Sequence, residues 1–198
     1  KKQRAASYQT IGDHLTFFSS FDEGLEADFA KGDKNIYSAP SQDESSSGKL
    51  GLPSSVQIVN DMGLFGSALH FKQKSKEVIF YGAEENINYQ AGSHEGTISL
   101  WLSLDPAEDL EPGYCDPIQI TDVRYNDAAY WVDFTKDNPR SFRMGVFGDL
   151  KSWNPDKIGP DDNPEFKNRL VIAKDRPFGH NIWTHVVLTF RDMNGQSS

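Results

Sequence analysis

The chain has 198 residues and carries 29 acidic against 20 basic side chains, which gives a formal net charge of −9. An acidic surface repels phosphate backbones, so this composition argues against nucleic acid as a partner. Hydrophobic residues make up 37% of the chain and aromatic residues 12%, which suffices for a packed core and excludes global disorder. The longest apolar run, 128–132, is far shorter than the roughly 20 residues that cross a bilayer. We therefore expect no transmembrane segment.

The single Cys115 excludes a fold held together by internal disulfides. The basic start of the chain, residues 1–4, is similar to the beginning of a signal peptide, but no apolar stretch follows it. Neither feature decides between a cytosolic and an exported protein.

Apolar and polar side chains alternate along most of the chain, which is the pattern of strands with one buried face. In chain order, the pattern predicts strands at 15–21, 56–59, 68–71, 78–81, 97–104, 118–123, 128–134, 140–147, 170–173 and 181–191. Turn-forming pairs such as Gly32-Asp33 and Pro112-Gly113 stand between them. A short helical turn is expected only at 105–110. The sequence therefore predicts an all-β fold, an antiparallel sandwich of two sheets or a jelly roll.

Two polar stretches, 38–55 and 153–166, predict long surface loops. Because no repeat or linker is visible, we expect one domain over residues 1–198. The strand at 181–191 is followed by the hairpin-type turn Asn194-Gly195, and the sequence stops three residues later. Natural proteins avoid an unpaired edge of this kind. We therefore expect the segment to be truncated at its C-terminus, with the final strands missing.

Four segments resemble the laminin-G-like jelly rolls of the concanavalin A-like lectin and glucanase superfamily, especially its exported bacterial members. They are the opening strand at 15–22 (LTFFSSFD), the segment at 63–71 (GLFGSALHF), and the strands at 97–102 (TISLWL) and 183–190 (WTHVVLTF). The resemblance implies a concanavalin A-like jelly roll and a secreted, cell-surface or periplasmic location. It also implies binding more often than catalysis, and core or groove-wall positions for Trp101 and Trp183.

The stretch at 127–134 contains the most distinctive candidates for a ligand site. Alternation places Trp131 and Asp133 on one face, and Arg143 lies on the polar face of another predicted strand. An indole stacks on the C–H groups of a sugar while charged side chains hydrogen-bond to its hydroxyls. We expect these three residues to bind a polysaccharide or glycoconjugate. The structural alternative is that Trp131 packs under a loop and Asp133 pairs with Arg143.

Asp22, Asp28 and Asp33 are the candidate metal ligands, because oxygen donors in a glycine-containing loop suit calcium. The EF-hand spacing is missing, and the alternative is that each aspartate stabilises a turn. The five histidines are scattered, which argues against zinc.

The sequence predicts no catalytic residues. It lacks both the E-x-D-x-x-E strand of the glucanase members and a G-x-S-x-G nucleophile elbow. The expected function is therefore a non-catalytic carbohydrate-binding or adhesion module. A protein–protein interaction module of a larger surface protein is the first alternative, and a polysaccharide-cleaving glycoside hydrolase is a distant one.

Overall fold

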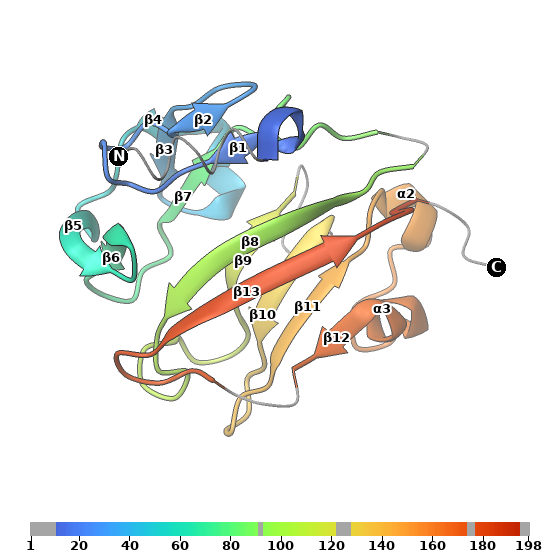
Figure 1. Ribbon diagram of the computed structural model, residues 1–198. Helices are drawn as coiled ribbons and strands as arrows, with labels where there is room; N and C mark the ends of the chain where they lie inside the picture. The colour runs from blue at the N-terminus through green and yellow to red at the C-terminus, as the bar shows by residue number, and fades with distance from the viewer. Residues whose placement is uncertain (1–10, 91–92, 122–127, 174–176, 195–198) are drawn as a thin grey trace. The chain divides into compact units, whose positions relative to one another are not determined.

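The structure is a computed structural model that describes residues 11–90, 93–121, 128–173 and 177–194 (Figure 1). It forms two compact units, residues 1–89 and residues 90–198. Strands in several antiparallel sheets dominate and the helices are few and short, so the all-β class is confirmed. The prediction of one jelly-roll domain, truncated at its C-terminus, stays a prediction. The basic start at 1–4, Asp127 and Gly195 lie outside the described residues.

The first unit contains three small sheets, all antiparallel. Their strands, in spatial order, are β1 (Phe17–Phe18) with β2 (Phe29–Ala30); β4 (Lys49–Leu50), β3 (Ile36–Ala39) and β7 (Val78–Tyr81); and β5 (Val56–Gly63) with β6 (Gly66–Phe71). Two 3-10 helices, η1 (Gly12–His14) and η2 (Gln42–Ser47), complete the unit. The expected loop at 38–55 is wrong in part, because it contains the end of β3, η2 and β4. Polar residues can form strands here because the half-buried Ser38 of β3 pairs with the exposed Lys49 of β4.

The second unit contains a four-stranded sheet in the order β12 (Leu170–Ile172), β11 (Phe142–Val146), β10 (Tyr130–Phe134) and β9 (Cys115–Ile120). A second sheet pairs β8 (Gly96–Ser103) with β13 (Trp183–Phe190). Two short helices, α2 (Leu150–Trp153) and α3 (Pro164–Arg169), lie between β11 and β12 in the chain. In Figure 1, the β8–β13 pair lies in front of the four-stranded sheet.

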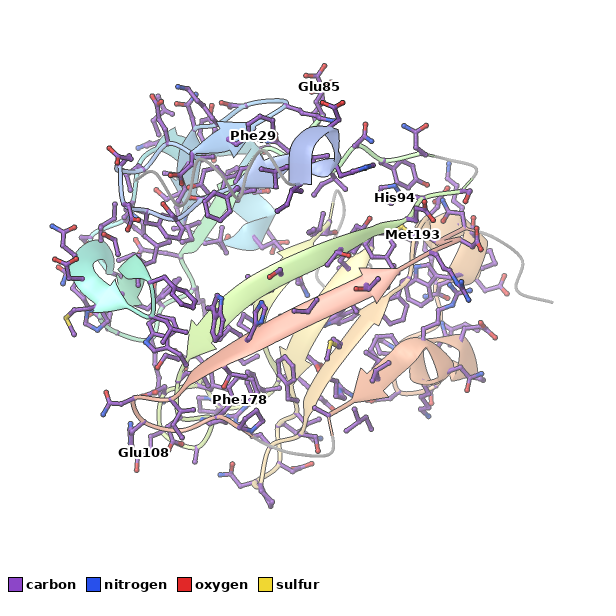
Figure 2. All side chains as sticks on the ribbon, in the orientation of Figure 1. Phe29, Glu85, His94, Glu108, Phe178 and Met193 are labelled. Atoms are coloured by element: carbon purple, nitrogen blue, oxygen red, sulfur yellow. The ribbon has the colours of Figure 1, made fainter. Side chains whose placement is uncertain are left out.

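One apolar core of the second unit lies between its two sheets. Val132 and Phe134 of β10 and Phe142 of β11 pack with Val186 of β13. Phe178, labelled in Figure 2, closes one end of this core, with its ring centroid 5.0 Å from that of Phe134 and 4.9 Å from that of Phe142. The two sheets therefore pack face to face through the apolar side chains that alternation assigns to the inside.

A second apolar core lies against the opposite face of the four-stranded sheet. Its buried members are Ala128, Trp131, Phe147, Trp153 and Phe166. Trp153 ends α2 and Phe166 lies in α3, so the expected surface loop at 153–166 is anchored in the core at both ends. Because both faces of the sheet are covered at this position, every residue of β10 is buried.

The described residues of the second unit cover one face of the β8–β13 pair. Within the described residues, β13 pairs with β8 and with no other strand. Its side chains alternate between buried and exposed positions, and His185, Val187 and Thr189 are exposed. Among the residues that the structure describes, no helix is long and apolar enough to span a membrane.

Candidate functional site

The three predicted sugar-binding residues come together on the helix-covered face of the four-stranded sheet. Asp133 lies directly opposite Arg143 in the register of β10 and β11. The guanidinium donates through Nε to Asp133 Oδ1 (2.8 Å) and through Nη2 to Asp133 Oδ2. The Asp133 residue is only 1% exposed, so its carboxylate is bound to Arg143 out of reach of a large ligand. The structural alternative for this pair is therefore the one that the geometry supports.

Trp131 is a core residue, 4% exposed, and the exposed platform expected at this position is wrong. Its ring centroid lies 5.7 Å from that of Phe147 and 4.9 Å from that of Phe166. Its indole N–H donates to Asp116 Oδ1 (3.0 Å). Alternation put Trp131 and Asp133 on the same face correctly, but it could not show that α3 and Phe147 cover this face.

Asp116 of β9 completes a group that we call the carboxylate cluster: Asp116, Trp131, Asp133 and Arg143. Trp131 and Asp133 are buried, and Asp116 and Arg143 are half-buried. Burial raises the pKa of Asp116 to about 6; the indole N–H of Trp131 opposes this increase, whereas the Asp133 carboxylate adds to it. At the exposed rim, the Tyr114 ring centroid lies 5.4 Å from the guanidinium carbon of Arg143. Sequence reasoning missed Asp116 because the strand predicted at 118–123 begins after it, whereas β9 begins at Cys115. The β9–β10 register shifts between Val132 and Phe134, next to this position.

The carboxylate cluster combines one ion pair, Asp133 with Arg143, and one carboxyl group, Asp116, whose pKa burial raises to about 6. Its partners come from three adjacent strands, and its hydrogen bonds are made between its own members. Such an arrangement fixes β9, β10 and β11 relative to one another, which is a structural role.

The three candidate calcium ligands do not form one site. Each accepts a hydrogen bond from a different backbone N–H: Asp22 from Ser67 (2.7 Å), Asp28 from Ser20 (2.6 Å) and Asp33 from Asn35 (2.9 Å). Within the described ranges, no three His, Cys, Asp or Glu side chains are grouped as a metal site requires. The turn-stabilising alternative accounts for Asp33, which accepts from the backbone two residues later in the chain. Asp22 and Asp28 instead join segments that are further apart in the sequence.

A second set of polar and aromatic side chains lies on the face of the β8–β13 pair that points away from the core. We call it the β8–β13 outer face and define it by eight residues: Thr97, Ser99, Trp101, Ser103, Trp183, His185, Val187 and Thr189. All are exposed except Trp183, which is half-buried. Figure 2 shows side chains standing out from the front of these two strands.

Trp101 and His185 are the centre of this face. They lie opposite each other in the register and stack, with ring centroids 4.3 Å apart and ring planes inclined by 7°. A hydrogen bond of 2.8 Å links His185 Nε2 and Ser99 Oγ. Trp101 remains 37% exposed. The resemblance implied a core or groove-wall position for Trp101, whereas the structure makes it a surface residue.

The comparisons identify no relative of this protein: no family model, curated protein or solved structure matches the chain significantly. The laminin-G-like resemblance therefore stays a prediction. The chemistry of the described side chains carries the functional argument.

Proposed function

We propose that the protein is a non-catalytic carbohydrate-binding or adhesion module, and that its sugar-binding surface is the β8–β13 outer face. The observation that carries this proposal is the exposed Trp101 indole stacked on His185. An indole contacts the C–H groups of a sugar ring, while hydroxyl and imidazole groups exchange hydrogen bonds with sugar hydroxyls. Affinity from such contacts is expected to be modest, on the order of micromolar to millimolar.

The stacked pair is held in place before any ligand binds. Trp101 and His185 are directly opposed cross-strand neighbours, and Ser99 orients the imidazole through its hydroxyl. Fewer rotamers are then lost when a sugar is bound, which lowers the entropic cost of association.

The proposal includes a laminin-G-like jelly roll of the concanavalin A-like kind and a secreted, cell-surface or periplasmic location. Both follow from the resemblance of the four sequence segments. Two features of the second unit support the fold: its strands pair antiparallel, and its two sheets pack face to face through Val132, Phe134 and Val186.

The proposed function is tested with Trp101→Ala in pull-downs on a panel of insoluble polysaccharides. We expect the variant to lose binding while its melting temperature stays close to that of the unaltered protein. The matched control is Phe71→Ala, which removes an aromatic side chain that is 59% exposed on β6, and it should bind normally. Unchanged binding by Trp101→Ala, or no binding by the unaltered protein, would overturn the proposal. A reducing-sugar assay on each bound polysaccharide distinguishes a binding module from a glycoside hydrolase, because only the hydrolase releases reducing ends.

A protein–protein interaction module is the second candidate, and the open edge of β13 favours it. Within the described residues, β8 and β13 pair only with each other, and the eight residues of β13 include no proline, lysine or carboxylate. An unprotected edge of this kind can pair with a strand of a second copy. Sedimentation velocity should then show concentration-dependent dimers that Val187→Lys weakens. A monomer at every concentration would exclude self-association through this edge.

A further inference from the structure

The β8–β13 outer face carries no carboxylate, amine or guanidinium among its eight side chains. Its polar groups are the hydroxyls of serine and threonine and one imidazole. The chain as a whole has a formal net charge of −9. A polyanion would therefore approach an acidic protein at a face that has no lysine or arginine, whereas an uncharged ligand needs no ion pair at this face.

The register makes the face long and narrow. Four cross-strand pairs point outward, in the order Trp183–Ser103, His185–Trp101, Val187–Ser99 and Thr189–Thr97. Neighbouring outward pairs are two residues apart along each strand, so the four pairs extend over roughly 20 Å at about 3.3 Å per residue. This length exceeds one sugar ring several times over.

The aromatic side chains are grouped at one end of this strip. Trp101 and Trp183 are diagonal neighbours across the two strands, a geometry that separates positions by roughly 7–8 Å. A single ring that stacks on Trp101 leaves Trp183 uncovered, whereas a chain of sugars reaches both. At the other end, the Thr97 and Thr189 hydroxyls lie 3.4 Å apart and provide polar groups for further units.

We propose, on the basis of the proposed function, that the ligand is an uncharged, extended polysaccharide lying along the β8–β13 outer face, with two of its sugar units on Trp101 and Trp183. A monosaccharide uses only part of this surface. An acidic polysaccharide is disfavoured by the charge of the protein and by the absence of lysine and arginine from the face.

The test is a titration of the full chain, followed by calorimetry, with β-1,4-linked gluco-oligosaccharides of one to six units and with a six-unit oligogalacturonate. We expect the association constant to rise at least about tenfold from one unit to six, and the oligogalacturonate to bind at least about tenfold more weakly than the neutral hexamer. Trp183→Ala should weaken binding of the hexamer about fivefold or more and reduce the dependence on length. Phe71→Ala should follow the unaltered protein.

Because Trp183 is half-buried, the melting temperature of each variant is also measured. Ser103→Glu provides a second variant, which leaves both indoles in place. A carboxylate at the aromatic end of the strip should weaken binding of the neutral hexamer less than fivefold. It should weaken binding of the oligogalacturonate more strongly. Preferential binding of the oligogalacturonate, or equal affinity for one and six units, would overturn the inference while leaving sugar binding intact. If neither these probes nor the polysaccharide panel bind the unaltered protein, the proposed function itself is overturned.

Discussion

The second unit contains two tryptophans that look alike in the sequence and have opposite surroundings. Trp131 and Trp101 each lie in a strongly alternating strand, and each points away from the core between the sheets. Trp131 is 4% exposed because α3 and Phe147 cover it, whereas Trp101 is 37% exposed on the β8–β13 outer face. Alternation therefore identified the face of each side chain, but it did not show which face a further layer covers. A ligand site inferred from a strand pattern is accessible only if no further layer covers that face.

The largest expected effect is on folding stability. Trp131→Ala should lower the free energy of unfolding by about 3–5 kcal/mol, because it leaves a cavity among Phe147, Trp153 and Phe166. Trp101→Ala should lower it by less than about 1 kcal/mol, since the side chain is on the surface. Urea unfolding followed by circular dichroism measures both values. Equal losses for the two variants would contradict the comparison.

Arg143→Met should destabilise the protein by about 3–5 kcal/mol, because it leaves the Asp133 carboxylate buried without its partner. The double variant Asp133→Leu with Arg143→Met removes both charges and should lose less stability than the single variant. Urea unfolding of the two proteins at the same pH checks the order. If the double variant were the less stable one, the pair would contribute more than the cost of removing its charges from water.

Asp116→Asn should change the dependence of stability on pH. The folded-state pKa of Asp116, about 6, lies above its ordinary value of 3.8, so the folded protein holds more protons than the unfolded chain between these pH values. The stability contributed by the protonated carboxyl is complete below pH 4 and is lost as the pH rises through 6. Above pH 6 the buried carboxylate costs on the order of 2–3 kcal/mol. The Asp116→Asn variant should regain part of this free energy above pH 6. Its amide oxygen can still accept the hydrogen bond from the Trp131 indole.

The measurement is the difference in unfolding free energy between Asp116→Asn and the unaltered protein at each pH from 4 to 8. The difference should grow from pH 4 to pH 6 and then stay level. His94, labelled in Figure 2, acts in the opposite direction, because burial lowers its pKa and its contribution increases with pH. Subtraction at each pH cancels this term. A difference that does not vary with pH would show that Asp116 keeps an ordinary pKa.

Much of the fold follows from local patterns. The strand predicted at 97–104 is β8, shifted by one residue, and the one predicted at 128–134 contains β10. The strands β2, β3 and β4 were missed. β2 and β4 have two residues each, which leaves no alternation to detect, and the four residues of β3 do not alternate between buried and exposed positions. The alternation of 97–104 also places Trp101 among Thr97, Ser99 and Ser103. This pattern indicates an exposed indole, but the resemblance led instead to a core or groove-wall position.

The sequence by itself determined the all-β class and the side of the strand on which each residue lies. It also offered Asp133 and Arg143 as a possible ion pair. These properties depend on a two-residue period and on the chemistry of single side chains. Only the tertiary structure decided that Trp131 is buried, that Asp116 joins the carboxylate cluster and that Trp101 remains at the surface. The reason is that burial depends on which segments pack over a face. At β10 those segments are 147–153 and 164–169, which follow the strand later in the chain. Their own sequences do not indicate which strand they pack against.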